Sequence, residues 1–289
     1  MFSTNTARRS CCISVCSFFI IIFLLFTIVT PVNVFAEDTA SAQGWKNIGG
    51  NTYYYTIDGT MLTGHQIIKG KHYLFNYNGS LIKKKGLIAF DGKEYYGTKS
   101  GTLRTGWIAY KEKGKLRASY FLKKSGAMKK GGTVKHLEIP ISGRLGRAYY
   151  YGIKVLNKNG WKMKKTFVYI ARHTKYAHRS MRRKSIDAYA VYGFKKHKGN
   201  CYVMASQFYV TMKLLGKDVK QYAGTVGSRE RAPHSWCVIK HKNGKKLIYD
   251  ISFYNHFHHL RGFPSGYAMK EGTRMSYKYN KKDKKIIGK

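Results

Sequence analysis

The chain is short of acidic residues and of cysteines. Its 289 residues include only 13 aspartates and glutamates against 54 lysines and arginines, a formal net charge of +41 at pH 7. Such a surplus needs an anionic environment, for which wall polymers, acidic lipids and nucleic acid are the possibilities, and charge alone does not choose among them. Of five cysteines, three precede residue 36, so only Cys201 and Cys237 remain beyond it.

Motifs for cofactors, metals and nucleic acid are also missing. The stretch GTVGS from Gly224 lacks the Lys-Ser/Thr ending of a phosphate-binding loop. His256, His258 and His259 have no carboxylate or thiol nearby in sequence, so we expect solvent-facing histidines rather than a metal site. No recognisable nucleic-acid-binding motif accompanies the basic charge. The sequence therefore predicts no cofactor, no metal and no nucleic-acid partner.

The first 36 residues read as a secretory signal peptide. Arg8 and Arg9 precede the apolar run ISVCSFFIIIFLLFTIV, and Val-Phe-Ala at 34–36 gives a small-residue cleavage pattern before Glu37 and Asp38. An uncleaved membrane anchor is the alternative, because the run approaches the ~18 to 20 residues of a spanning helix. We expect a secreted protein with no stable membrane span after cleavage, and a short linker at residues 37–43.

A repeat follows the linker. Gly44, Gly64, Gly86 and Gly106 each precede a bulky residue, and between them aromatic segments are joined by Asp-Gly, Asn-Gly or Ser-Gly turns, which is typical of hairpins. One hairpin cannot bury its own face, so the pattern predicts a stacked β-hairpin solenoid over residues 44–132. Residues 133–289 then form a second domain.

The pattern GW...YYY..DG.M.TG resembles the cell-wall-binding repeats of choline-binding and glucan-binding surface proteins. That resemblance implies aromatic cages for choline or platforms for sugars, with choline, glucan and teichoic acid all open as ligands. His65 and Leu87 replace the motif's tryptophan in the middle units. A structural spacer is the alternative, because aromatic stripes are often core. The expected ligand-binding residues are Trp45, Tyr54, Tyr55, Tyr73, Tyr95, Tyr96 and Trp107.

The second half changes character. We expect an extended, tyrosine-rich start at residues 148–155, a helix from 161 to about 176, and a further helix capped by Ser185. The stretch GNCYVMASQFYVTM then predicts a buried helix with Asn200 as N-cap, Cys201 as first helical residue and Gly216 as its stop. The helix dipole favours a thiolate at that position.

A hairpin is predicted in PHSWCVIKHKNGKKLIYDISF, with strands at 234–240 and 246–253. A two-residue Asn-Gly turn would pair Cys237 with Asp250 and turn His234 away. A three-residue loop at 242–244, with Gly244 left-handed, pairs Trp236 with Asp250 and lets the carboxylate reach His234. We expect the second register, because a functional set of thiol, imidazole and carboxylate requires it.

The ordered motifs GNCYVMA, HSW and YD resemble the transglutaminase-like superfamily. The resemblance implies a papain-like α+β core in which Cys201 is the nucleophile, His234 the base and Asp250 the orienting acid. It further implies attack on a protein or peptide amide through a thioester, with water or an amine as acceptor. The amide of Cys201 is the expected first oxyanion donor, and Trp161 and Tyr192 are candidates for the second.

The sequence is compatible with two functions. The first is a cysteine acyl-transfer enzyme, either a transglutaminase or a cysteine peptidase or amidase, held at a Gram-positive-like cell wall by glycan or teichoic acid. The second is an inactive, basic, wall-binding or adhesive protein. A disulfide between Cys201 and Cys237 would block the nucleophile, so two free thiols are expected. Trp236 is expected to form a wall of the site.

Overall fold

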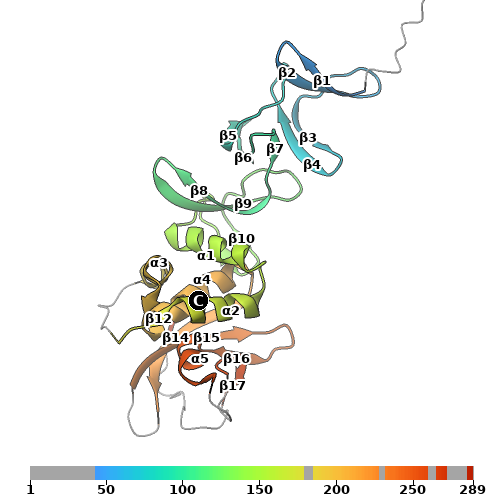
Figure 1. The fold of residues 1–289 in the computed structure, drawn as a ribbon. Helices are drawn as coiled ribbons and strands as arrows, with labels where there is room; N and C mark the ends of the chain where they lie inside the picture. Colours follow the sequence, from blue (N-terminus) through green and yellow to red (C-terminus); the bar gives the residue numbers. More distant parts are fainter. Residues whose placement is uncertain (1–42, 179–184, 228–231, 260–264, 272–284, 289) are drawn as a thin grey trace, which may run out of the picture. The chain divides into compact units, whose positions relative to one another are not determined.

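The computed structural model describes residues 43–178, 185–227, 232–259, 265–271 and 285–288 (Figure 1). The predicted signal peptide lies outside the described residues. Within those ranges, no helix has both the length and the apolar character needed to cross a membrane. The mixed helix and strand content, with antiparallel hairpins, agrees with the predicted α+β class. The division into domains stays a prediction.

The repeat region consists of hairpins that start at the four predicted glycines. Each pairs antiparallel without a break in register. β7 (Thr102–Leu103) joins the middle two hairpins into the sheet β3-β4-β7-β6-β5. The hairpins are β1 (Gly44–Ile48) with β2 (Asn51–Tyr55), β3 (Gly64–Ile68) with β4 (Lys71–Phe75), β5 (Gly86–Phe90) with β6 (Lys93–Gly97), and β8 (Gly106–Glu112) with β9 (Lys115–Phe121).

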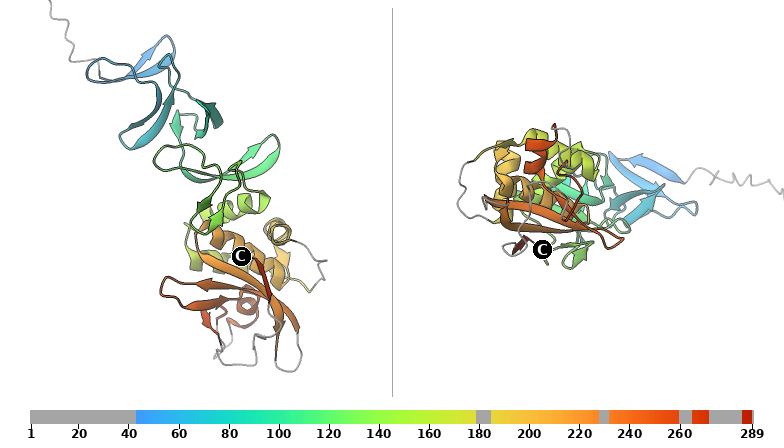
Figure 2. Two further views of the ribbon diagram at one scale, coloured as in Figure 1. Left: turned by 180° about the vertical axis from the view of Figure 1, so that it is seen from behind. Right: turned by 90° about the horizontal axis from the view of Figure 1, so that it is seen from below.

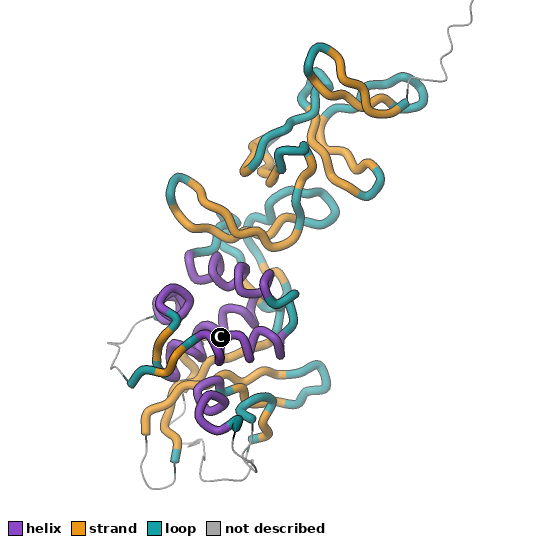
Figure 3. Tube along the Cα trace, in the orientation of Figure 1, coloured by secondary structure: helices purple, strands orange, loops and turns teal. Residues whose placement is uncertain are grey.

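Among the described residues, helices begin after this region and a short hairpin (Figure 3). α3 starts with Ser185 as N-cap, as predicted, and the Ser185 hydroxyl accepts from the Ala188 N–H. The elements in chain order are β10 (Thr133–Val134), β11 (Leu137–Glu138), α1 (Arg147–Lys158), α2 (Met163–His173), β12 (Lys175–Tyr176), α3 (Ile186–Lys196), β13 (Lys198–Gly199) and α4 (Cys201–Leu214).

A five-stranded antiparallel sheet completes the fold, in the order β17-β16-β15-β14-β18. α4 contacts α1, α2 and α3 as well as β14 and β15, and the views in Figures 1 and 2 place it between α1 and these strands. Twelve of its residues are buried, so it is the central element of the core. The remaining elements are β14 (Asp218–Val226), β15 (Ala232–Lys240), β16 (Lys246–Tyr249), α5 (Ile251–Phe257), β17 (Met269–Lys270) and β18 (Lys285–Gly288).

The extended start predicted at residues 148–155 is wrong, because this segment belongs to α1. Ala148, Gly152, Ile153 and Leu156 are its buried residues, and their spacing is helical. A Cβ added to Gly152 would lie 3.0 Å from a Leu214 methyl carbon, so the glycine allows α1 to approach α4 closely. Helix packing has therefore overridden the strand preference of the neighbouring tyrosines.

For the hairpin predicted at residues 234–253, the predicted register is confirmed, but the predicted length of the return strand is wrong. Cys237 pairs with Tyr249 and Lys240 with Lys246, which is the register of the three-residue loop, and Gly244 has φ +77°. The return strand, however, ends at Tyr249 instead of residue 253. Asp250 caps α5, and its Oδ1 accepts from the Phe253 N–H at 3.0 Å. An aspartate that caps a helix ends the strand before it.

Candidate active site

Cys201 lies at the start of α4, as predicted, and is 4% exposed. Asn200 is the N-cap, and its Oδ1 accepts from the Val203 N–H at 3.3 Å. The first turn of α4 contains no acidic residue. The side chain of Cys201 therefore lies at the N-terminal end of α4, next to the backbone amide groups of its first turn.

His234 lies between the thiol and a carboxylate. It comes from β15, is 5% exposed, and its Nε2 is 2.6 Å from Asp250 Oδ2. Its side chain is also hydrogen-bonded to that of Cys201. Since Nε2 faces the carboxylate, Nδ1 is the nitrogen left for the sulfur. The three predicted residues therefore meet in space, although 49 positions separate the outer two.

Asp250 is held as an ionised carboxylate. It is 1% exposed, and its Oδ1 accepts from the Ser252 hydroxyl at 2.8 Å and from the Phe253 N–H. Burial alone would raise the pKa of Asp250, but the charge of His234 and these hydrogen bonds outweigh burial and lower it. Ser252 was not singled out in the sequence, because it was expected to lie on a strand.

The imidazole is correspondingly basic. Burial lowers the pKa of His234, whereas the charge of Asp250 and hydrogen bonds to Asp250 and Cys201 raise it, with a net rise to about 10. An imidazole hydrogen-bonded to a thiol is the arrangement that a thiol nucleophile requires.

Side chains on the neighbouring strands fix the site. The Trp236 ring stacks on that of His234, with centroids 6.1 Å apart and 20° between planes, which agrees with the predicted wall. Gln221 Nε2 donates to Ser235 Oγ at 3.0 Å and to Ser206 Oγ at 3.1 Å. This buried network joins α4 to β14 and β15, and no local sequence signal indicated it.

Cys237 faces a different environment. Its Sγ donates to the Ala205 carbonyl at 3.3 Å, and both cysteines are free. Burial raises the pKa of the Cys237 thiol well above its ordinary value. The molecule therefore holds one thiol next to an imidazole and one in an apolar core, which makes Cys237 a natural control.

Tyr176 is a residue of the site that sequence reasoning missed. β12 pairs in parallel with β13, which places Tyr176 opposite Gly199, two positions before Cys201. Its ring meets the His256 ring edge-on, with centroids 5.3 Å apart. Burial, with Cys201 and Asp250 nearby, raises the pKa of Tyr176 to about 12, so its hydroxyl keeps its proton. A cavity of about 600 Å³ opens beside it, between α2 and α5.

Trp161 and Tyr192, the candidates for the second oxyanion donor, and the three histidines near the end of α5 all lie within the described residues. Trp161 Nε1 donates to Asn157 Oδ1 at 2.9 Å, at the junction of α1 and α2. Tyr192 lines a shallow pocket with residues of α1. His256, His258 and His259 are exposed, as expected. Within the described residues, no three His, Cys, Asp or Glu side chains are grouped to hold a metal.

The repeats bring three of the seven expected ligand-binding residues together. The Trp45 ring meets Tyr54 edge-on at a centroid distance of 5.1 Å and Tyr73 at 4.9 Å, and it stacks on Phe75 at 5.9 Å. Trp45 is 43% exposed. We call Trp45, Tyr54 and Tyr73 the aromatic cluster; its rings come from two successive hairpins, with Trp45 exposed and the two tyrosines half-buried.

The other four expected ligand-binding residues lie elsewhere. Tyr95 is 3% exposed and is a core residue, which corrects the expectation that it faces a ligand. Tyr96 packs against Tyr110 and Phe121. Trp107 meets Tyr120 edge-on and packs on the helical core. The Tyr55 ring is covered by the Lys46 ammonium at 5.4 Å.

The second unit shows why the aromatic cluster is not repeated. His65 takes the place of tryptophan, and its Nε2 lies 2.9 Å from His72 Nδ1. The His65 ring also stacks against Tyr95, with centroids 6.0 Å apart. Burial and the positive charges of His72 and Lys93 lower the pKa of His65. A half-buried histidine pair therefore fills the position that Trp45 occupies in the first unit.

The choline-binding repeat family matches residues 42–85. No curated protein matches. Choline binding protein F from Streptococcus pneumoniae is 28% identical over 36% of this chain and 34% of its own, with a TM-score of 0.28. The same protein in the presence of a peptidoglycan analogue gives 26% identity over 36% and 40%, with a TM-score of 0.22.

A choline binding domain from the same species is 38% identical over 22% of this chain and 84% of its own, with a TM-score of 0.21. The chain thus spans about a third of the length of choline binding protein F. The matched segment contains all three residues of the aromatic cluster. What the comparisons give for this chain is thus a match of residues 42–85 to the choline-binding repeat family.

Proposed function

We propose that this protein is a cell-wall-attached cysteine enzyme that transfers acyl groups from protein or peptide amides through a thioester. The observation that carries the proposal is the hydrogen-bonded series of Cys201, His234 and Asp250. The motifs around these residues resemble the transglutaminase-like superfamily, and a helix start bearing the thiol beside strands bearing the imidazole supports a papain-like core for residues 133–289.

The residues support the following reaction. The Cys201 sulfur attacks the carbonyl carbon of a carboxamide, and backbone N–H groups at the start of α4 stabilise the oxyanion. The His234 imidazolium gives its proton to the departing nitrogen, the C–N bond breaks, and a thioester and an amine or ammonia result. Water or a primary amine then attacks the thioester while His234 removes a proton, and the thiolate leaves.

An inactive, adhesive protein is the competing function. It would need neither a carboxylate held ionised in the interior nor an imidazole bonded to it. Burying charged groups costs free energy, so a protein without chemistry at this position gains little from keeping them. We therefore favour the enzyme.

Thiol labelling tests the proposal. At pH 6 an ordinary thiol is only roughly 0.3% ionised, so iodoacetamide is expected to modify Cys237 slowly. Modification of Cys201, which lies beside the His234 imidazolium, is expected to be far faster. In His234→Ala the rate at Cys201 is expected to fall by about 100-fold, since the stabilising imidazolium is gone. Mass spectrometry of timed digests gives both rates in one sample. Equal, slow modification of the two cysteines would contradict the proposal.

We further propose that the aromatic cluster attaches the enzyme to the wall by binding a choline head group. The family match over residues 42–85 supports a choline ligand, and the exposed face of Trp45 supports its position. A quaternary ammonium held by aromatic faces gains about 2 kcal/mol when desolvated. Secretion and residence on a Gram-positive-like surface follow from the same proposal.

Trp45→Ala is expected to weaken choline binding by about tenfold or more, because it removes the ring that both tyrosines contact. Tyr77→Ala is the matched control, since Tyr77 is 76% exposed and stacks only on Phe90 outside the aromatic cluster. Calorimetric titration with choline measures both. Equal affinities in the two variants would place the ligand elsewhere.

A further inference from the structure

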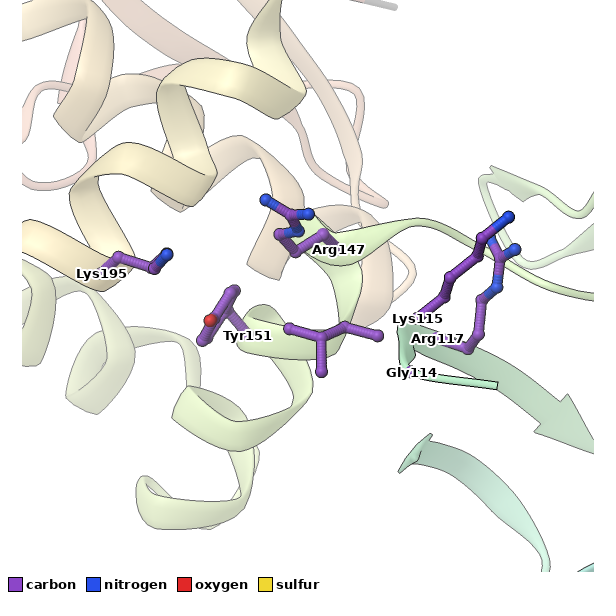
Figure 4. Close-up of a pocket in the computed structure, with 7 residues that line it drawn as sticks. Gly114, Lys115, Arg117, Arg147, Tyr151 and Lys195 are labelled. Atoms are coloured by element: carbon purple, nitrogen blue, oxygen red, sulfur yellow. The ribbon is translucent and has the colours of Figure 1, made fainter. Parts of the chain in front are cut away.

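A second, cationic cavity lies apart from both sites. It has a volume of about 520 Å³ and lies between β9, α1 and α3. Figure 4 shows Arg147 between Lys195 on one side and Lys115 with Arg117 on the other. Leu116 and Tyr151 supply apolar surface. We call this the cationic cavity; neither the catalytic residues nor the aromatic cluster line it.

Three of the four positive charges in the cationic cavity have no carboxylate close by among the described residues. Its lining contains no aspartate or glutamate. Among the described residues, Lys115, Arg147 and Lys195 have no carboxylate within 4 Å. Close like charges repel one another, so four cations around one cavity are stable together only when an anion or its counterions reduce that repulsion.

The fourth cation, Arg117, has an unused hydrogen-bond donor. Its Nε is buried and has no hydrogen-bond partner. The closest carboxylate, Glu112, is 3.8 Å away, and both of its oxygens instead accept from Arg144 Nε at 2.9 Å. A buried donor without a partner costs free energy. The protein therefore leaves the guanidinium of Arg117 only partly neutralised.

The backbone adds to the positive potential. α1 begins at Arg147, its N-cap Gly146 has no side chain to accept from the first turn, and that turn contains no acidic residue. The partial positive charge of the helix start therefore adds to the side-chain charges. Two guanidinium groups with forked donors suit the oxygens of a phosphate better than a single carboxylate.

We propose that the cationic cavity binds phosphate groups of an anionic, phosphodiester-linked wall polymer. Leu116 and Tyr151 provide apolar surface for the carbon chain between two phosphates. The net charge of +41 favours such a polymer over an isolated anion, because long-range attraction grows with the number of charges on the partner. This site is independent of the thiol reaction and of choline binding.

The test compares two variants of equal charge. Arg147→Gln with Lys195→Gln removes two exposed cations from the cationic cavity, and Arg104→Gln with Lys83→Gln removes two exposed cations from the repeats. Affinity for a glycerol phosphate oligomer is measured by fluorescence anisotropy on the full chain at 0.15 M salt. We expect at least a tenfold loss in the first variant and less than a twofold loss in the second.

Two further probes separate the sources of binding. Inorganic phosphate is expected to compete only at high concentration, and polyglutamate of matched charge is expected to bind at least tenfold more weakly than the oligomer. Equal losses in the two variants, or equal affinity for polyglutamate, would overturn the proposal and leave a diffuse basic surface. Unchanged labelling of Cys201 verifies folding, and the single exposed substitution Lys195→Gln, with a smaller loss expected, serves if the double variant does not fold.

Discussion

Cys201→Ser is expected to reduce turnover to the background rate, a fall of roughly 10⁶-fold. Serine keeps the size of the side chain and leaves the Asn200 cap in place, so the fold of α4 is retained. A hydroxyl, however, is not ionised by a neighbouring imidazolium as a thiol is. Incorporation of a fluorescent primary amine into a glutamine-rich protein measures transfer, and release of peptide fragments or ammonia measures hydrolysis.

Cys237→Ser is the control for this substitution. Cys237 Sγ donates to the Ala205 carbonyl, and a serine hydroxyl can make the same bond, so turnover is expected to stay within about twofold of the original. Loss of activity in Cys237→Ser together with full activity in Cys201→Ser would show that Cys237, and not Cys201, is the nucleophile. The ratio of amine incorporation to hydrolysis in the unmodified protein identifies the acceptor.

Asp250→Asn is expected to lower kcat by about 10⁴-fold with little change in fold. Asparagine is as good an N-cap as aspartate, so α5 keeps its first turn. What is lost is the negative charge that holds the His234 proton and orients the ring. A kcat within tenfold of the original would show that the carboxylate only supports structure.

The same variant changes how stability depends on pH. Because the pKa of His234 is raised to about 10, its contribution to the free energy of unfolding is complete below 6.5 and is lost as pH rises through 10. The pKa of Asp250 is lowered, so its contribution is present above 3.8 and is lost as pH falls through the lowered value. In Asp250→Asn both slopes are expected to flatten, as measured by denaturant unfolding across this range.

Features with a local cause could be predicted from the sequence. Asn200 and Gly216 set the ends of α4, and Gly244 fixed the loop that gives the hairpin its register. The meeting of His234 and Asp250 followed from that register together with the demands of the chemistry. Each of these signals lies within a few residues of the structure it determines.

Features that depend on distant contacts could not be predicted. Tyr176 is brought near Cys201 by a parallel pairing of β12 with β13, two very short segments that local preference does not indicate. The close approach of α1 to α4 depends on Gly152, which lies against Leu214. Tyr95 is in the same motif position as an exposed aromatic would be, but it packs with Leu74, Ile88, Leu103 and Ala127. In all three cases tertiary packing outweighed local preference.

Asp250 holds two parts of the structure: its Oδ2 is bonded to the His234 imidazole, and its Oδ1 caps the N-terminus of α5. Fraying of a single helical turn would therefore release the carboxylate from its fixed orientation while the rest of the chain remained folded. In the proposed reaction, the imidazole would then lack the partner that orients it.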